Sequence, residues 1–317
     1  MFKNKSVGVV IPAYNEEKNI LRVINTLPDF IDYIIIVDDF SSDNTSCLIE
    51  KEMNNNSKIF LIKHSYNKGA GSARMAGYEY ARRENIDIVA AMDADGQMDP
   101  GELESLCLPI AEGKADYVKG NRLVYDGAWN IMPRYRFIGN SILSLLTKIA
   151  SGYWFLTDTQ TGYTAISRRA LKQLNLSKIY PRYGFLNDIF IKLNVIQARI
   201  KEIPIKPIYH PDGKSGIRLM EVIPKISWLL FKGFFWRLKE RYIIRDFHPL
   251  VFFYYFSFFL ILTDLALIVR LFIILFETGR VAPINMLAII LVSITSLQFL
   301  LFAMWFDMDY NKELRIR

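Results

Sequence analysis

The sequence predicts an α/β protein with a mainly parallel sheet, followed by interfacial amphipathic helices and a two-helix transmembrane hairpin. Three observations over the 317 residues support this prediction. Apolar strands alternate with helical segments in the first half of the chain, as in parallel sheets covered on both faces. A segment that mixes aromatic and basic residues comes next, and two long apolar segments follow it. We expect a soluble domain over 1–217, juxtamembrane amphipathic helices over 218–249, two membrane spans within 250–306 and a cytoplasmic tail over 307–317.

Four apolar strands alternate with helices over the first hundred residues. The strands are VGVVIP from residue 7, YIIIVDD from 33, KIFLIKH from 58 and IDIVAAMD from 86. Helical spacing of the apolar residues predicts a first helix over 16–27, and further helices are expected from about 43 and over 69–83. In parallel sheets of this kind, ligands bind at the carboxyl ends of the strands.

Polar residues follow the end of each predicted strand. They are Tyr14, Asn15 and Glu16, then Asp38 and Asp39, then Asn67 and Lys68, and finally Asp93 and Asp95. A helix-entry cap is an alternative explanation for Asp38 or Asp39 alone, because DDFSSDNT is rich in capping residues. Taken together, these residues predict a polar, acidic site at one edge of the sheet.

Asp93 and Asp95 stand two residues apart directly after the fourth strand, and Gln97 follows them. Like charges this close repel each other unless a cation lies between them. Carboxylate and amide oxygens suit Mg²⁺ or Mn²⁺, ions that are often held by one or two carboxylates and by substrate phosphates. A solvated turn is the alternative.

Two other ways of binding a nucleotide are not supported by the sequence. NKGAGSARMAG lacks the third glycine of a dinucleotide fingerprint, because Arg74 stands in its place, and the chain has no G-x-x-x-x-G-K-[ST] loop. The two cysteines, Cys47 and Cys107, have no paired spacing, which argues against a zinc site or a disulfide framework. We therefore expect a metal ion to hold the phosphates.

Six motifs in this order resemble glycosyltransferase family two. They are VVIPAYNEEKNI, IIVDDFSSDNT, NKGAGSARMAG, DADGQMDPGEL, KGNRL and DTQTGYTAIS. Within the family, the chain is most similar to the branch that glycosylates polyprenyl or dolichyl phosphate, which includes dolichyl-phosphate mannose and glucose synthases. The resemblance spans about residues 5–215 and implies the GT-A fold, a Rossmann-like, mainly parallel sheet that binds nucleotide sugars.

The resemblance also implies roles for individual residues. The donor-binding residues would be Pro12, Tyr14, Glu16, Asp39, Lys68, Asp93, Ala94, Asp95, Gln97 and Arg122, with Asp39 reaching the base. Asp93, Asp95 and Gln97 would hold Mg²⁺ or Mn²⁺ on the diphosphate. The acceptor phosphate would bind Arg136, Asn140, Lys214 and Ser215. The catalytic residues would be Asp95, Arg122, Asp158 and Gln160, the last two on the sugar side. The family pattern differs after DTQTG, where Tyr-Thr replaces an expected Phe-Arg.

These roles agree with the chemistry of glycosyl transfer. Breaking the anomeric C–O bond leaves charge on a nucleoside diphosphate, and a metal ion and guanidinium groups stabilise that charge. The planar fork of arginine matches a phosphate in a bidentate fashion. A phosphate-monoester acceptor is already an anion near neutral pH, so no catalytic histidine is needed. Surface solubility is the alternative explanation for Arg122 and Arg136.

The net charge is +7, and basic residues concentrate between 201 and 245. Aromatic residues from Trp228 to Trp236 are interleaved there with Lys225, Lys232, Arg237, Lys239 and Arg241. This mixture just before a membrane segment predicts a helix that lies on anionic lipid. We expect no nucleic-acid partner, because the basic segment adjoins a membrane anchor.

Segments 250–276 and 283–306 are each long enough to cross a hydrocarbon core, which takes about 20 residues. Asp264 lies inside the first span, and we expect it to bond across to Ser293, Thr295, Ser296 or Gln298, with Arg270 reaching the far headgroups. Basic residues at both outer ends of the hairpin place those ends, and the soluble domain, in the cytoplasm. The hairpin could also join two copies of the chain.

The expected function is that of a membrane-bound inverting hexosyltransferase. It would move a hexose from UDP-glucose, UDP-N-acetylglucosamine or GDP-mannose to polyprenyl or dolichyl phosphate, giving a lipid-linked sugar donor for glycan assembly. A transferase of the same fold with another lipid or glycan acceptor is the first alternative, and a non-catalytic membrane scaffold is the second. No motif in the sequence identifies the base or the sugar.

Overall fold

The computed structural model describes residues 2–127, 134–208 and 219–316, with the backbone alone described at 134–136 and 219–222. The chain divides into two compact units. The first contains Met1–Phe234 together with Glu313–Arg317, and the second contains Phe235–Lys312. The sheet lies in the first unit and the two long apolar helices lie in the second.

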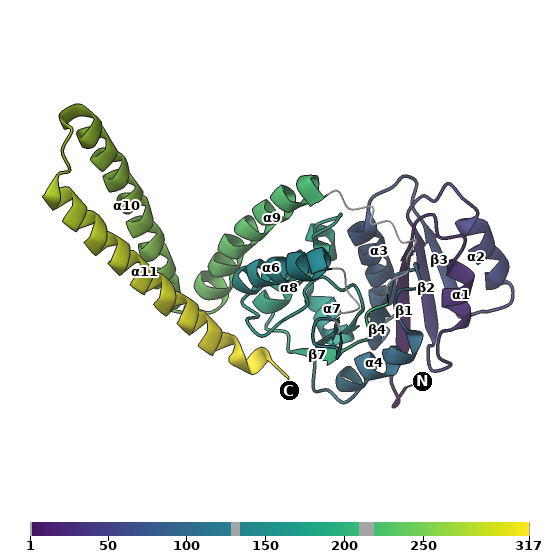
Figure 1. Cartoon of the computed structure of the whole chain (residues 1–317). Coiled ribbons are helices and arrows are strands. Elements are labelled where there is room, and N and C mark those ends of the chain that lie inside the picture. The colour runs from purple at the N-terminus through teal and green to yellow at the C-terminus, as the bar shows by residue number, and fades with distance from the viewer. Residues whose placement is uncertain (1, 128–133, 209–218, 317) are drawn as a thin grey trace. The chain divides into compact units, whose positions relative to one another are not determined.

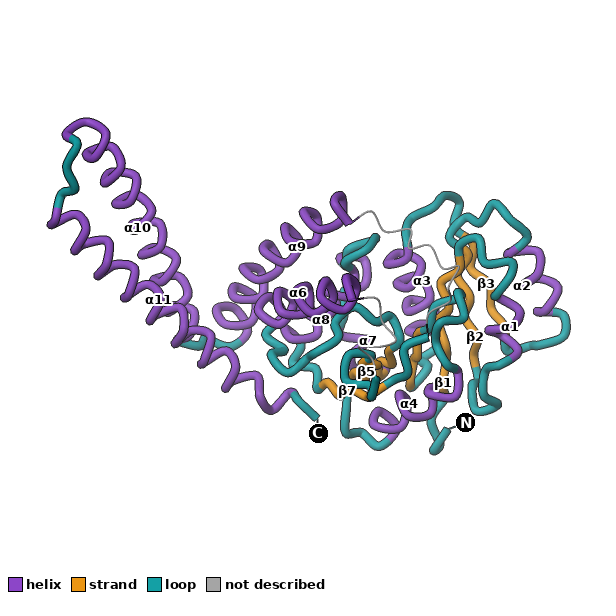
Figure 2. The backbone as a smooth tube through the Cα atoms, viewed as in Figure 1, coloured by secondary structure: helices purple, strands orange, loops and turns teal. Residues whose placement is uncertain are grey.

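A seven-stranded sheet forms the centre of the first unit (Figures 1 and 2). Its strands are β1 (Val7–Ala13), β2 (Tyr33–Asp38), β3 (Ile59–Lys63), β4 (Ile88–Ala91), β5 (Tyr117–Asn121), β6 (Thr164–Ser167) and β7 (Ile200–Pro204). Their order in the sheet is β3-β2-β1-β4-β6-β5-β7, and only β6 runs antiparallel to its neighbours, β4 and β5. The predicted mainly parallel sheet is confirmed.

Helices cover both faces of this sheet (Figure 1). One face packs against α1 (Ile20–Asn25), α2 (Thr45–Met53) and α4 (Leu103–Ala111), and the other against α3 (Ala70–Arg83), α7 (Arg168–Gln173) and α8 (Phe185–Val195). Short 3₁₀ turns occupy Pro100–Glu102 and Leu176–Lys178. In β1, Val9 and Ile11 enter one core while Val10 enters the other, which explains why the strand is apolar throughout. Helix α1 begins later than predicted, because residues 17–19 form a turn after Asn15, whose φ is +56°.

Helix α9 (Leu219–Lys239) leads from the first unit into the second, where a π-helical turn (Glu240–Arg245) follows it. Helices α10 (Leu250–Thr278) and α11 (Pro283–Asn311) pack against each other, and a 3₁₀ turn (Lys312–Leu314) comes after them. Both helices are long and apolar enough to cross a membrane. The Ser293 hydroxyl donates to the Asp264 carboxylate at 2.5 Å, which confirms the predicted bond between the helices.

Two basic residues that we expected at the lipid surface are buried instead. The Arg237 guanidinium donates to both carboxylate oxygens of Asp307 at 2.9 Å, and both side chains are fully buried. The Tyr242 hydroxyl donates to the same carboxylate at 2.6 Å, and the Arg241 guanidinium lies over the Tyr242 ring at 5.4 Å. The expectation that Arg237 and Arg241 face headgroups is therefore wrong. A buried guanidinium needs a counter-charge, and Asp307 supplies it.

The last described residues return to the first unit. The Ile316 amide donates to the Ile200 carbonyl of β7 at 2.9 Å, and Arg315 forms a parallel bridge with Ile200. The Arg315 guanidinium also lies 5.8 Å from the centre of the Phe155 ring. Residues 315 and 316 thus extend the sheet at its β7 edge.

Candidate active site

The carboxyl ends of the parallel strands meet the start of β6 at one edge of the sheet. Ala13 at the end of β1 pairs with Asp38 at the end of β2, and Ala91 at the end of β4 pairs with Thr164. Because β6 is antiparallel, the loop that precedes it, residues 157–163, reaches the same edge. The fold therefore brings the ends of β1, β2 and β4 to one edge, as the sequence predicted, and the end of β5 and the loop before β6 lie at this edge too.

Asp39 is buried at this edge, and its carboxylate is held by the protein. It accepts hydrogen bonds from His64 Nδ1 at 2.6 Å and from the amides of Lys68 at 2.9 Å and Gly69 at 2.7 Å. Gly69 has a φ of +95°, a conformation that favours glycine, and it stands directly before α3. Asp39 thus fixes the corner that opens α3, and its contact with a nucleotide base stays a prediction. The partner His64 was missed, because it lies 25 residues away.

Glu16 and Asp93 bring negative charge together from two loops. Burial raises the pKa of the Glu16 carboxyl, a hydrogen bond from Asn19 opposes this, and the charges of Asp43 and Asp93 add to the rise. The carboxylates of Glu16 after β1 and Asp93 after β4 therefore repel each other electrostatically. Such a negative region attracts a cation. Tyr14 beside it exposes half of its side chain, which leaves an aromatic surface open to a base.

A protein cation lies against the first aspartate of the Asp93–Asp95 pair. The buried Arg74 donates from Nη2 to Asp93 Oδ1 at 2.8 Å, while the Asp93 side chain stays 44% exposed. The Asp95 carboxylate accepts from the Gln97 amide at 2.9 Å, and Ala94 between them is buried. The charge of Asp93 is thus balanced in part by Arg74, a residue whose position in NKGAGSARMAG gave no sign of this contact.

The site suits a divalent ion that shares its ligands with a substrate. Among the described residues, no group of three or more His, Cys, Asp or Glu side chains converges on one point. Two carboxylates at an exposed edge are hard donors that Mg²⁺ or Mn²⁺ accepts when a diphosphate and water complete the shell. Asp93, Asp95 and Gln97 could hold such an ion together with a diphosphate, and their role as its ligands stays a prediction.

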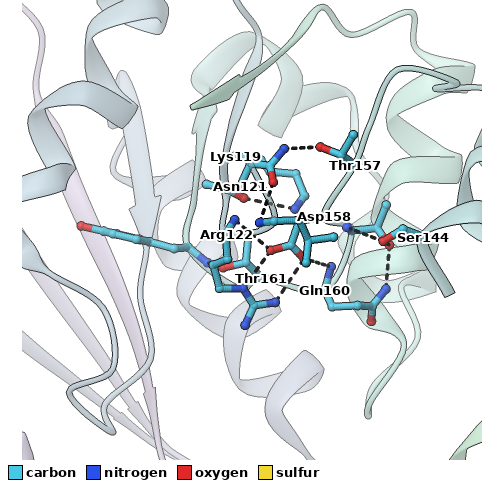
Figure 3. A network of polar contacts seen from close by, with 12 residues as sticks. Lys119, Asn121, Arg122, Ser144, Thr157, Asp158, Gln160 and Thr161 are labelled. Atoms are coloured by element: carbon cyan, nitrogen blue, oxygen red, sulfur yellow. Dashed lines mark hydrogen bonds and ion pairs between the residues drawn. The ribbon is translucent and has the colours of Figure 1, made fainter. Parts of the chain in front are cut away.

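Arg122 follows β5 and is clamped by Asp158 (Figure 3). Its Nε donates to Asp158 Oδ2 at 2.8 Å and its Nη2 to Oδ1 at 3.1 Å. Asp158 is fully buried, whereas the Arg122 side chain is 21% exposed. Burial alone would raise the pKa of the Asp158 carboxyl, but the charges of Arg122 and Lys119 outweigh it and hold that pKa well below its usual range. The clamp therefore joins two residues that we predicted separately as catalytic.

Hydrogen bonds also fix the loop on the other side of Asp158 (Figure 3). The Gln160 amide donates to Asp158 Oδ1 at 3.1 Å, and the Thr159 amide donates to the Ser144 hydroxyl of α6 (Arg134–Ser151) at 3.1 Å. At its start, the Thr157 amide donates to Glu202 of β7 at 3.0 Å. Burial lowers the pKa of the nearby Lys119 ammonium, against the opposing charges of Asp158 and Glu202. The loop is thus a rigid support for Arg122.

Helix α6 turns polar residues inward and apolar residues outward. Ser144 and Thr147 are buried, and Thr147 accepts a hydrogen bond from Asn187 of α8 at 2.6 Å. The exposed residues on the same helix are Ile138, Ile142, Leu145 and Leu146. The polarity is the reverse of that of a helix on a water-soluble protein. Helix α9 also exposes Trp228 and Phe231, whose rings stack 5.5 Å apart.

The side chains of three of the four predicted acceptor residues lie outside the described part of the structure. Lys214 and Ser215 lie outside the described residues, and the side chain of Arg136 on α6 does as well. Asn140, the fourth, is half-buried on α6.

Comparison with known proteins identifies the family. Residues 8–174 match Glycosyl transferase family 2. The chain belongs to this family. Similar proteins include the UDP-N-acetylglucosamine--dolichyl-phosphate N-acetylglucosaminyltransferase of Methanococcus voltae, 38% identical over 65% of this chain and 87% of that protein. The undecaprenyl-phosphate mannosyltransferase of Micrococcus luteus is 29% identical over 66% of this chain and 86% of its own length.

The structural comparison supports the same fold. The glucosyl-3-phosphoglycerate synthase of Mycobacterium tuberculosis, solved with Mn²⁺ and UDP, aligns with a TM-score of 0.53 over 74% of this chain and 80% of that one. Its sequence identity of 20% makes this a likeness of fold alone. The predictions of the GT-A fold and of a glycosyltransferase from family 2 are therefore confirmed.

Proposed function

We propose that this family 2 glycosyltransferase transfers a hexose from a nucleotide diphosphate sugar to polyprenyl or dolichyl phosphate. The outward apolar face of α6 carries the proposal, because it lies on the helix that holds Arg136 and Asn140. Such a face suits an acceptor whose phosphate emerges from lipid. The names of the Methanococcus voltae and Micrococcus luteus proteins, which include dolichyl phosphate and undecaprenyl phosphate, add support.

We propose a UDP-sugar as the donor, with UDP-N-acetylglucosamine first, in keeping with the name of the Methanococcus voltae protein. Tyr14 and Asp39 would contact the nucleoside, with Pro12, Glu16 and Lys68 around them. Asp93, Asp95 and Gln97 would hold Mg²⁺ or Mn²⁺, which supplies positive charge to the diphosphate. Arg122, held in place by Asp158, would donate to the departing phosphate oxygens.

The transfer itself needs no protein base. An oxygen of the acceptor phosphate attacks the anomeric carbon from the side opposite the diphosphate, and the configuration there is inverted. The new C–O bond forms as the old one breaks, and the nucleoside diphosphate leaves with the bonding electrons. Arg136, Asn140, Lys214 and Ser215 would receive the acceptor phosphate, and Gln160 would line the sugar. Basic residues at both ends of the hairpin support a site on the cytoplasmic side of the membrane.

A transfer assay with the full chain in vesicles that contain polyprenyl phosphate can test this proposal. The assay uses labelled UDP-N-acetylglucosamine, UDP-glucose and GDP-mannose in turn. We expect label from one donor in the organic extract, only when Mn²⁺ or Mg²⁺ is present. The Asp95→Asn variant is the control and should leave the extract unlabelled. Label found only in a water-soluble product, or in lipid regardless of Asp95, would contradict the proposal.

A further inference from the structure

Arg74 connects the two loops that frame the site. It lies in α3 and is almost fully buried. One guanidinium nitrogen donates to Asp93 Oδ1 at 2.8 Å, and the other terminal nitrogen donates to the Gly162 carbonyl. Asp93 belongs to the loop after β4, and Gly162 belongs to the loop before β6. A planar group with several fixed donors can bridge two such acceptors, which a lysine ammonium does less well.

Packing alone does not account for an arginine at this position. Its Nε is buried and finds no hydrogen-bond partner among the described residues. A buried donor without a partner is unfavourable, so the arginine is better explained by the two acceptors that its terminal nitrogens reach. The guanidinium also lies 5.3 Å from the centre of the Phe185 ring, which fixes its plane from one side.

There is little room for a side chain at Gly162, next to Arg74 and Asp93. A Cβ atom at this residue would lie 3.0 Å from Arg74 Nη2 and 3.0 Å from Asp93 Oδ2. Four residues earlier, the same loop carries Asp158, which clamps Arg122. Arg74, Asp93 and Gly162 therefore form one close-packed joint, and the loop links that joint to Arg122.

We infer that Arg74 is a positioning residue that sets the distance between the carboxylate of Asp93 and the guanidinium of Arg122. These are the groups that would face the metal-bound and the departing ends of one diphosphate, so the inference rests on the proposed function. Arg74 acts on Asp93 directly through its hydrogen bond and on Arg122 through the Gly162–Asp158 loop.

Calorimetric binding of UDP to the full chain, with and without Mn²⁺, tests this inference. Arg74→Lys keeps the charge but cannot bridge both acceptors, so we expect UDP to bind about 10-fold more weakly with Mn²⁺, or about 1.4 kcal/mol. The spacing that Arg74 sets matters only while Asp93 carries its charge, so Arg74→Lys combined with Asp93→Asn should bind within about twofold of Asp93→Asn alone. Arg82→Lys on the same helix, where Arg82 pairs with Glu79, is the matched control and should bind as wild type does.

Gly162→Ala provides an independent variant, since it leaves Arg74 and Asp93 chemically intact but crowds both. We expect weaker UDP binding with Mn²⁺ here too. Wild-type binding by Gly162→Ala or Arg74→Lys, or additive losses in the double variant, would overturn the inference. If Asp93→Asn alone leaves metal-dependent UDP binding unchanged, the proposed metal site fails, and the inference fails with it. If Asp93→Asn weakens UDP binding and the loss in the double variant is the sum of the two single losses, the metal site stands and only the role of Arg74 is refuted.

Discussion

Replacing Asp158 with asparagine should destabilise the first unit and weaken donor binding together. The variant keeps the shape of the side chain but removes the charge that pairs with Arg122 and balances the buried Lys119. Removing one partner of a buried ion pair costs about 3–5 kcal/mol. For a unit of this size, each kcal/mol lowers Tm by about 2–4 °C, so we expect a fall of about 6–20 °C.

The pH dependence of this loss has a definite sign. The pKa of the Asp158 carboxyl in the folded protein lies well below its usual range, because Arg122 and Lys119 outweigh the effect of burial. The pair therefore stabilises the fold above about pH 4, and this contribution is lost as the pH falls toward the folded-state pKa. The Tm difference between wild type and Asp158→Asn should be complete at pH 7 and should shrink below about pH 4.

Thermal unfolding in detergent and UDP calorimetry with Mn²⁺ would measure both effects. Asp116→Asn is the matched control, because Asp116 is buried just before β5 and accepts from Arg199 at 3.2 Å, at the end of the strand away from Arg122. It should lower Tm but leave UDP affinity unchanged. A Tm within about 2 °C of wild type for Asp158→Asn, or equal loss of UDP binding in the two variants, would refute this reasoning.

Three further predictions concern the metal, the acceptor and the membrane. Asp95→Asn should abolish transfer, because a metal-bridged charge is worth several kcal/mol. It should keep the wild-type Tm, because it removes metal binding and not packing. Activity within about threefold of wild type would remove Asp95 from the metal site. Arg136→Ala should impair acceptor kinetics by roughly 10- to 150-fold and change donor affinity less, because it removes a charged hydrogen bond worth about 1.5–3 kcal/mol. A large loss of donor affinity by calorimetry with normal acceptor kinetics would reassign Arg136 to the donor. Ile142→Ser with Leu145→Ser should lower transfer to lipid-embedded polyprenyl phosphate and leave UDP affinity intact; unchanged transfer would show that the exposed face of α6 does not contact lipid.

The edge of the sheet that carries the site could be predicted from the sequence because the rule behind it is local. Asp93 and Asp95 directly follow a buried strand, and parallel strands end at a common edge. The pairing of Asp264 with a serine of the second helix was predictable for a similar reason. An intramembrane carboxylate needs a partner, and the neighbouring helix offered few polar residues.

The partners of the site residues and of Arg237 could not be predicted, because each lies far away along the chain. Arg74 and Asp93 are 19 residues apart, Arg122 and Asp158 are 36 apart, and Arg237 and Asp307 are 70 apart. No periodicity links residues at such separations, and only the folded chain brings them together. The outward orientation of the apolar face of α6 could not be predicted for another reason. Helical spacing of apolar residues identifies a face, but it does not say whether that face points to the core or outward.

The return of residues 315 and 316 to β7 changes how the apolar hairpin is connected. The polypeptide leaves the first unit at Phe234 and rejoins it at Glu313, so the hairpin is an insertion with two attachments. A protease cut in the turn between α10 and α11 would leave α10 covalently joined through α9, while α11 would be held by non-covalent contacts alone, among them the Ile316 amide on the Ile200 carbonyl and the Asp307 carboxylate on Arg237. The same contact covers the outer edge of β7, where an open strand would otherwise invite another chain to pair.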